Sequence, residues 1–268
     1  MKYIRFAALL LSLALLAGCS IIPFQTPEEQ RAAQQAAEAL RLEAQAQADP
    51  VAALDGDFIL NRVLTNAVGT QLATYRVTFP RFSESGEKAQ SFARINSFYE
   101  DEITGLIQDA YSFFSVVKAA YGEEWDAVTV ADKAFSISIT YTLLEAPAGY
   151  LCVRCDFRVE ENSQVETYSQ AQVFLLDNGW RLTMESLLGD GYETAAPKLM
   201  ASILAWCTNN GIAVTAADTC TLEDFSDNYA LTTEGFLFYT EPFQLNNKNA
   251  NRYSIPVSLS GYRSLLED

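Results

Sequence analysis

Cysteine offers the widest range of chemistry in this sequence, which contains five cysteines. Two of them, Cys152 and Cys155, have C-x-x-C spacing. At the start of a helix, that spacing is typical of thiol redox centres and metal sites. Here both cysteines fall in a segment with alternating apolar residues, which predicts a strand. Residues three apart on a strand lie on opposite faces and about 10 Å apart, farther than the roughly 7 Å between Cα atoms that a disulfide spans. We therefore expect no redox centre, and we expect Cys155 to be a small core residue.

A second pair of cysteines, Cys207 and Cys220, brackets the connection between a predicted helix and a predicted strand. Disulfides form and persist in proteins that are exported to oxidising surroundings. The sequence leaves two states open for this pair, namely a disulfide between the two residues and two free thiols.

Histidine is absent from the sequence. This excludes Ser-His-Asp and Cys-His catalysis and histidine-ligated zinc. Adjacent carboxylates are present, but neighbours on a helix or strand do not converge on one substrate bond, as the carboxylates of a glycosidase must. These pairs are Asp101-Glu102, Glu123-Glu124 and Glu160-Glu161. No EF-hand-like spacing of acidic residues indicates a calcium site. We expect no catalytic residue, no metal and no cofactor, and thus a protein that is not an enzyme.

The fifth cysteine, Cys19, follows a short apolar segment at the start of the chain. Lys2 and Arg5 make a basic start, and the apolar run 6–17 is shorter than the roughly 20 residues that a membrane span needs. This pattern is typical of a secretory signal peptide. Leu16-Ala17-Gly18-Cys19 resembles the lipobox that lipoprotein signal peptidase recognises. The alternative is an ordinary signal peptide with an incidental cysteine.

The lipobox interpretation predicts the location of the mature protein. The signal peptide would be residues 1–18, and Cys19 would carry the lipid. Because a single acyl chain anchors only marginally, we expect further acylation, such as palmitate. The mature chain would then be a membrane-anchored lipoprotein that faces the extracytoplasmic side.

The sequence is strongly acidic, with 18 Lys and Arg against 34 Asp and Glu. Cleavage before Cys19 would remove Lys2 and Arg5, which leaves 16 cations against 34 acids and a formal charge of −18. Such a surface repels nucleic acid and anionic lipid, and it favours cationic partners. We therefore expect no nucleic-acid ligand. The acidic residues are scattered along the sequence, so solubility alone is the competing explanation of the charge.

Composition divides the mature chain into a stalk and a domain. Residues 19–56 are rich in Ala, Gln and Glu without a wide apolar face, which fits either a solvated helix or a disordered tether. Residues 57–268 carry the apolar patterns of a folded domain, with an N-terminal part at 57–130 and a C-terminal part at 131–268.

Two long helices and several strands are predicted within the domain. Apolar residues spaced by three and four predict helices over 87–117 and 192–207. Alternation predicts strands, and Asp177-Asn178-Gly179 predicts a hairpin turn into a strand at 180–184. The other predicted strands are 74–79, 135–143, 150–159, 168–176, 236–239 and 251–258, and a short terminal helix is predicted at 261–266. Hairpin-linked strands predict the α+β class, an antiparallel sheet with two main helices packed on one face.

The segment from Tyr229 to Leu245 resembles the closing motif of a bacterial extracytoplasmic domain family. That motif is a strand, the pattern lt-x-x-G, an aromatic strand and then P-[YF]-x-[IL]. The matching residues here are Leu231-Thr232-Thr233-Glu234-Gly235, Phe236-Leu237-Phe238-Tyr239 and Pro242-Phe243-Gln244-Leu245. Looser matches are Tyr75–Pro80, Ile95-Asn96, Gln172–Gly179 and Ile255-Pro256-Val257. The family forms the outer part of RsiV-type anti-sigma factors and precedes the catalytic domain of a peptidoglycan deacetylase.

This resemblance implies a binding or sensing domain whose partner is lysozyme or another cationic protein that acts on the cell wall. The implied binding loop is Glu241, Pro242, Phe243, Gln244, Asn246 and Asn247. We expect Phe236 and Phe238 to be core residues, and Phe243, which follows Pro242 at a strand end, to be an exposed binding edge. The loop departs from the family pattern, because an Asn-rich run at 246–251 replaces a Pro-, Tyr-, Ala- and Gly-rich turn. The alternatives are a peptidoglycan- or cell-wall-binding module and, third, an uncharacterised cell-wall hydrolase or a deacetylase accessory protein.

Overall fold

The computed structural model describes residues 53–162, 164–215, 220–246, 248 and 250–258. The expected signal peptide, Cys19, all but the last residues of the predicted stalk and the predicted terminal helix lie outside these ranges. All described residues belong to one structural unit. Its strands are β1 Leu54–Thr65, β2 Gln71–Phe82, β3 Phe135–Leu144, β4 Tyr150–Glu161, β5 Gln164–Leu175, β6 Tyr229–Leu231, β7 Gly235–Tyr239 and β8 Ser254–Ser258. Its helices are α3 Ala89–Tyr121, α4 Met184–Leu188 and α5 Tyr192–Asn209, with short 3₁₀ turns η1 Glu123–Ala127, η2 Gly189–Gly191 and η3 Leu222–Phe225.

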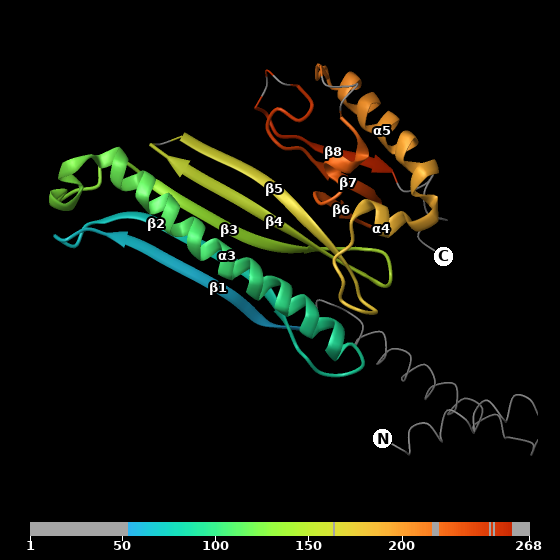
Figure 1. Cartoon of the computed structure of the whole chain (residues 1–268), viewed down its shortest axis with the longest axis horizontal. Coiled ribbons are helices and arrows are strands. Elements are labelled where there is room, and N and C mark those ends of the chain that lie inside the picture. Colours follow the sequence, from blue (N-terminus) through green and yellow to red (C-terminus); the bar gives the residue numbers. More distant parts are fainter. Residues whose placement is uncertain (1–52, 163, 216–219, 247, 249, 259–268) are drawn as a thin grey trace, which may run out of the picture. The chain divides into compact units, whose positions relative to one another are not determined.

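The predicted α+β class is confirmed, and the strands form two sheets. The larger sheet has the order β1-β2-β3-β4-β5, and the smaller has the order β6-β7-β8 (Figure 1). All neighbours pair antiparallel except β2 and β3, which are parallel. Parallel neighbours need a long crossover connection, and α3 provides it. The larger sheet is therefore mixed where an antiparallel sheet was expected, and it joins the two predicted parts of the domain.

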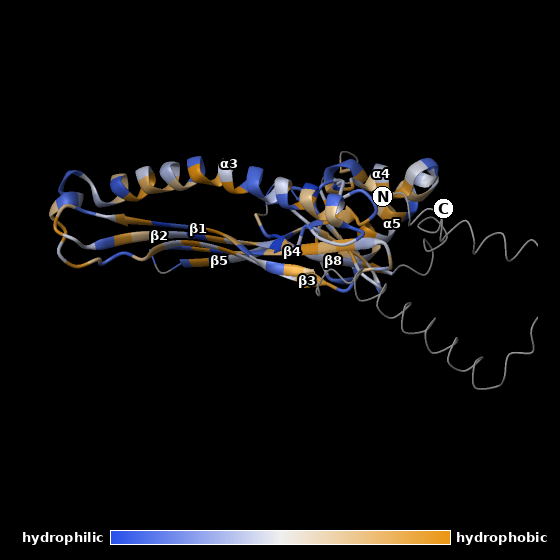
Figure 2. Ribbon diagram, turned by 90° about the horizontal axis from the view of Figure 1, so that it is seen from below, coloured by the Kyte–Doolittle hydropathy of each residue, from blue (hydrophilic) through white to orange (hydrophobic). Residues whose placement is uncertain are grey.

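Helix α3 lies along one face of the larger sheet (Figure 2). The apolar positions that predict this helix all belong to one core cluster with β2, β3 and β4. Phe92, Ile95, Tyr99 and Val117 are at most 2% exposed. Gly122 ends the helix in a left-handed conformation, with φ of 75°. The helix therefore extends slightly beyond the predicted 117, up to the glycine that stops it.

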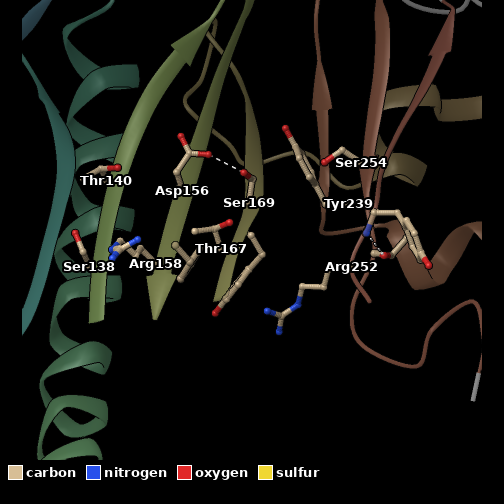
Figure 3. A pocket seen from close by; sticks show the side chains of 13 residues that line it. Ser138, Thr140, Asp156, Arg158, Thr167, Ser169, Tyr239, Arg252 and Ser254 are labelled. Carbon is tan, nitrogen blue, oxygen red and sulfur yellow. Dashed lines mark hydrogen bonds between the residues drawn. The ribbon is translucent and has the colours of Figure 1, made fainter. Parts of the chain in front are cut away.

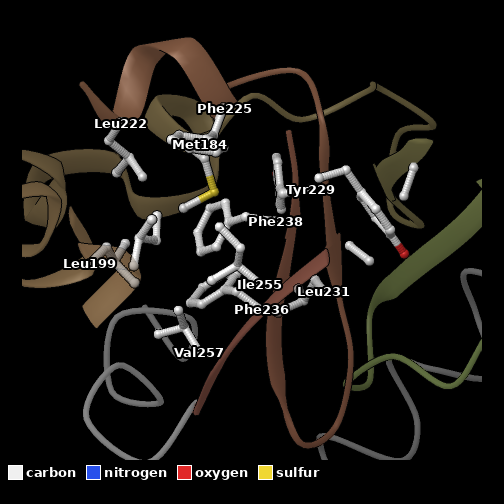
Figure 4. Packing of buried hydrophobic residues seen from close by; sticks show 14 of the residues in the cluster. Met184, Leu199, Leu222, Phe225, Tyr229, Leu231, Phe236, Phe238, Ile255 and Val257 are labelled. Atoms are coloured by element: carbon white, nitrogen blue, oxygen red, sulfur yellow. The ribbon is translucent and has the colours of Figure 1, made fainter. Parts of the chain in front are cut away.

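A second core lies between the smaller sheet and α5. Figure 4 shows Met184, Leu199 and Phe225 around the side chains of β7 and β8. Phe236 and Phe238 are 2% and 0% exposed, which confirms them as core residues. The two main helices thus serve different cores, since α3 packs on the larger sheet and α5 on the smaller one.

Two local differences from the prediction have physical causes. Strand β1 begins at Leu54, before the predicted start of the domain at 57, and the sequence did not predict it, because only Leu60 and Leu64 in it are buried. In place of the strand predicted at 180–184, the structure has a single β-bridge, between Phe174 and Arg181. Thr183 then caps α4 through a bond from the Ser186 N–H, so the chain turns into a helix.

Within the described ranges, no helix combines the length and the apolar character that a membrane crossing requires.

Candidate functional site

The implied binding loop folds into a tight turn at Glu241–Gln244. The Gln244 N–H donates to the Glu241 carbonyl over 3.3 Å, and Phe243 has a φ of 66°. A proline followed by a residue with positive φ is the pattern of a type II turn, where the second position usually holds glycine. Phe243 occupies that position, and its side chain is 54% exposed. The expectation of an exposed aromatic residue after Pro242 is therefore met in the structure.

The side chains that follow Phe243 hold the turn in place. Gln244 Oε1 accepts from the Glu241 N–H at 2.7 Å, and Gln244 Nε2 donates to the Asp224 carbonyl at 3.0 Å. Leu245 is buried at 3% exposure. Asn246 Nδ2 donates to the Ala213 carbonyl at 3.0 Å, whereas Asn247 lies outside the described residues. The loop therefore presents Phe243 on a fixed support.

Glu241 connects this turn to the larger sheet and to the segments that precede β6 and β8. Its Oε1 accepts from Gln170 Nε2 at 3.0 Å and from Asn228 Nδ2 at 3.4 Å. Its Oε2 accepts from the Arg252 guanidinium at 3.4 Å. Glu241 thus has a positioning role in addition to any contact with a partner.

Glu241 also lines a cavity of about 370 Å³, which we call the acidic cleft. Five carboxylates border it, from segments that are far apart in the sequence. They are Glu102 on α3, Glu223 and Asp224 in η3, Asp227 before β6, and Glu241. One guanidinium, Arg181, shares the lining, and it is already bonded to Asp227, at 2.8 Å to the carbonyl and 3.5 Å to the carboxylate. The cleft therefore has an excess of negative charge, and Glu241 connects it to the turn that holds Phe243.

The negative charge of the acidic cleft can accept a lysine or arginine side chain. No group of three or more His, Cys, Asp or Glu in the described residues is arranged to hold a metal. One of the five carboxylates, Asp224, already accepts from the Thr221 N–H at 2.7 Å and so closes the turn of η3. Two further carboxylates of the cleft, Asp227 and Glu241, are paired with Arg181 and Arg252.

Cys152 and Cys155 lie in β4 and contribute to different cores, Cys152 to that of the smaller sheet and Cys155 to that of α3. This confirms that they point to opposite faces of the strand. Burial raises the pKa of each thiol to about 12. A thiol that stays protonated is a poor nucleophile, so neither residue is placed for redox chemistry.

Cys207 and Cys220 are both buried free thiols in this structure. Burial raises the pKa of Cys220 to about 11, with a further contribution from Asp224. The disulfide that the sequence leaves open is thus not formed here. Cys19 lies outside the described residues, so its lipidation stays a prediction.

Sequence reasoning did not find the acidic cleft, nor a second cavity of about 480 Å³ between the two sheets. The acidic pair Asp101-Glu102 indicated a solvated helix face, and Thr221–Asp224 indicated a turn. A signal for the second cavity was present, because Ser136, Ser138, Thr140 and Thr142 alternate with apolar residues in β3. Such alternation marks a polar face without indicating what faces it.

Comparison with known proteins finds similarity in fold. No protein-family model and no curated protein matches the sequence. The structure is similar to that of a DUF3298 family member from Bacteroides fragilis, with a TM-score of 0.50, 11% identity and coverage of 78% of this chain and 91% of that chain. A DUF3298 family protein from Pseudomonas aeruginosa PAO1 matches with a TM-score of 0.42, 12% identity and coverage of 75% and 88%. At 11% identity, the first match indicates a shared fold.

Proposed function

We propose that this chain is a lipid-anchored extracytoplasmic domain that binds a cationic protein, with lysozyme as the specific candidate. The observation that carries the proposal is Phe243, an exposed aromatic residue held in a left-handed conformation. It belongs to the same turn as Glu241, which lines the acidic cleft, and the next residue, Gln244, bonds the carbonyl of Asp224, which also lines it. The resemblance of the Tyr229–Leu245 segment to the RsiV-type family supports the choice of lysozyme.

The conformation of Phe243 has an energetic consequence. A left-handed backbone costs a residue with a side chain about 1–2 kcal/mol, and glycine would avoid that cost. Strained residues of this kind cluster at ligand-binding positions. Exposed aromatic residues are also frequent anchors of protein interfaces. The presence of phenylalanine at a position where glycine would cost less conformational energy therefore favours a role in contact with a partner.

The acidic cleft would complement a basic partner. Charges at the rim of an interface raise the association rate and make binding depend on salt. At physiological ionic strength, screening acts over about 8 Å, so carboxylates close to the bound partner matter more than distant ones. We expect binding that weakens as salt is added.

Calorimetric titration of the full chain with lysozyme at low and at physiological salt tests the proposal. We expect binding at low salt that weakens with salt, and no comparable binding to a second basic protein of unrelated fold. Phe243→Gly should retain the fold, because glycine suits a positive φ, and it should weaken binding about tenfold or more through loss of the anchor. Absence of binding to lysozyme at low salt would overturn the proposal.

A matched pair of double variants separates the acidic cleft from overall charge. Glu102→Gln with Glu223→Gln removes two carboxylates of the cleft, and Glu123→Gln with Glu124→Gln removes two from η1, about 30 Å along α3 from Glu102. Both pairs change the net charge equally. We expect only the first to weaken binding, by about three- to tenfold. Equal effects of the two pairs would assign binding to total charge and contradict a role for the cleft.

The lipid anchor is tested separately. Mass spectrometry of the chain expressed in a bacterium should show an N-terminal diacylated or triacylated Cys19, and Cys19→Ala should release the protein from membranes. An unmodified Cys19 in membrane-bound material would rule out lipid anchoring and leave the binding proposal to its own test.

A further inference from the structure

The face of the larger sheet that is turned away from α3 changes from apolar to polar along β3, β4 and β5. At one end, Leu144, Cys152 and Val173 are cross-strand partners and join the core of the smaller sheet. Farther along the same face, the cross-strand rows become Thr140–Asp156–Ser169 and Ser138–Arg158–Thr167. Because side chains alternate along a strand, these two rows share the face of Cys152. They form the polar floor of the 480 Å³ cavity.

The smaller sheet supplies the opposite wall of this cavity. Figure 3 shows Tyr239 and Ser254 from β7 and β8 facing Asp156 and Ser169 across it. Nine of the thirteen lining residues carry a hydroxyl group. They are Ser138, Thr140, Thr167, Tyr168, Ser169, Tyr239, Thr240, Tyr253 and Ser254. A hydroxyl group both donates and accepts hydrogen bonds, so the cavity matches a ligand that does the same.

Two buried polar atoms in this lining have no hydrogen-bond partner among the described residues. They are the Tyr239 hydroxyl and Arg252 Nε. Tyr239 is only 3% exposed, and burial raises its pKa above the ordinary value, so the hydroxyl stays protonated and able to donate. Leaving a buried donor unpaired costs about 1–3 kcal/mol. Both atoms would be satisfied by acceptor oxygens of an occupant of the cavity.

The charged groups around the cavity are already paired. Arg252 donates to Glu166 at 2.8 Å and to Glu241 at 3.4 Å, and it stacks on the Tyr168 ring at 3.6 Å. Arg158 pairs with Glu160 at 3.3 Å. Asp156 accepts from Ser169 at 2.6 Å and from Arg154 at 3.2 Å. The cavity therefore offers hydrogen bonds without an unpaired charge, which favours an uncharged ligand.

From these features we infer that the cavity between the two sheets is a binding site for an uncharged saccharide of one or two rings. Its volume of about 480 Å³ lies in the range of roughly 300–1,000 Å³ that small-molecule sites occupy. The hydroxyl rows on β3–β5 bind the sugar hydroxyls, and Tyr239 and Arg252 donate to its oxygens.

This site is distinct from the acidic cleft. The two cavities share no lining residue. Along β5, Thr167 and Ser169 contribute to the floor of the saccharide site, whereas Gln170 and Gln172 line the acidic cleft. Ser169 and Gln170 are neighbours on a strand, so they point to opposite faces. The bond between Glu241 and Arg252 links the two linings. A protein partner at Phe243 and a sugar between the sheets are nevertheless tested with different ligands, and either test can fail without the other.

Calorimetry or NMR titration of the full chain with neutral disaccharides tests the inference, using maltose, cellobiose and N,N′-diacetylchitobiose. We expect at least one to bind in the millimolar range or more tightly, and we expect glucose to bind better than glucuronate. Tyr239→Phe removes only the unpaired hydroxyl, so it should weaken binding about fivefold without lowering the melting temperature. The control Tyr141→Phe removes a hydroxyl that bonds Asp57 outside the cavity, and it should bind as the unchanged chain does.

Three results would overturn the inference. No binding of any of the three disaccharides at tens of millimolar rejects a saccharide ligand. Preference for glucuronate over glucose rejects an uncharged one. If Tyr239→Phe binds the sugar as tightly as the unchanged chain does, the sugar binds outside this cavity.

Discussion

Gly179 illustrates how one residue can depend on the packing of two distant segments. It has a φ of 74° in the hairpin turn after β5, and a Cβ atom added to it would lie 2.3 Å from the Ser91 carbonyl oxygen in α3. Real Cβ atoms do not approach backbone so closely, so the turn or the helix would have to move. The glycine thus allows the hairpin to lie against the helix.

Replacing this glycine should be markedly destabilising. Gly179→Ala adds both a strained φ and a backbone clash, so we expect the free energy of unfolding to fall by about 2–4 kcal/mol. Gly69→Ala is the matched control, because Gly69 has a φ of 87° and an added Cβ would meet nothing within 4 Å. It should lose only about 1 kcal/mol. Urea unfolding of both variants measures the difference, and equal losses would show that the contact with Ser91 is unimportant.

Single residues were predictable from the sequence where their environment is local. The opposite faces of Cys152 and Cys155 follow from strand periodicity, and the exposure of Phe243 follows from its place after Pro242 at a strand end. The positive φ of Phe243 was not predictable, because residues other than glycine rarely adopt it. The free Tyr239 hydroxyl was not predictable either, since it depends on which strands the smaller sheet faces.

At the scale of elements, Asn96 joins α3 to the end of β2. Its Oδ1 accepts from the Phe82 N–H at 2.9 Å, and its Nδ2 donates to the Phe82 carbonyl at 2.8 Å. Asn96 is 2% exposed and Phe82 is 1% exposed. The amide therefore satisfies both backbone groups of a buried residue, at the place where the strand gives way to the connection with the helix.

Truncating this side chain should loosen the contact between the helix and the strand. Asn96→Ala leaves the Phe82 N–H and carbonyl buried and unpaired, which should lower the free energy of unfolding by about 2 kcal/mol. Ser97→Ala changes the exposed neighbour in the same helix turn and should stay within about 0.5 kcal/mol of the unchanged chain. Hydrogen exchange of the Phe82 amide should also accelerate in Asn96→Ala. Unchanged protection of that amide would contradict the proposed role.

Elements with strong periodicity were found from the sequence, and those held by tertiary contacts were not. Helix α3 and strands β3 and β4 follow their apolar patterns closely. Strand β1 lies at a sheet edge and buries only Leu60 and Leu64, so its pattern does not alternate. Residues 180–184 alternate like a strand, yet the Thr183 cap and the core around Met184 favour α4.

At the scale of the whole unit, the sequence predicted the α+β class, but it did not predict that the strands divide into two sheets. Strand pairing between distant segments, such as β2 with β3 on the far side of α3, is not encoded in local periodicity. The same limit applies to the acidic cleft. Glu102 and Glu223 lie on separate elements and border one cavity only after the smaller sheet packs beside the larger one.

The stability of the whole unit should depend on pH in the alkaline range. Cys152 and Cys155 come from one strand and are buried in the two different cores. Burial raises the pKa of each thiol from 9.0 to about 12, and it raises the pKa of Tyr75 from 10.0 to about 12. The folded state therefore retains protons that the unfolded state releases. Folding stability should be complete below pH 9 and should fall as the pH rises towards 12.

Chemical unfolding at pH 7, 9, 10 and 11 measures this dependence. We expect the free energy of unfolding of the unchanged chain to change little from pH 7 up to about pH 9. It should then be lower at pH 10 and lower again at pH 11. Cys152→Ala with Cys155→Ala removes two of the groups responsible, so its stability should fall less steeply above pH 9, whatever its starting value at pH 7. If both proteins lost stability in parallel between pH 9 and 11, the buried thiols would not be the cause, and the tyrosines would have to account for the whole effect.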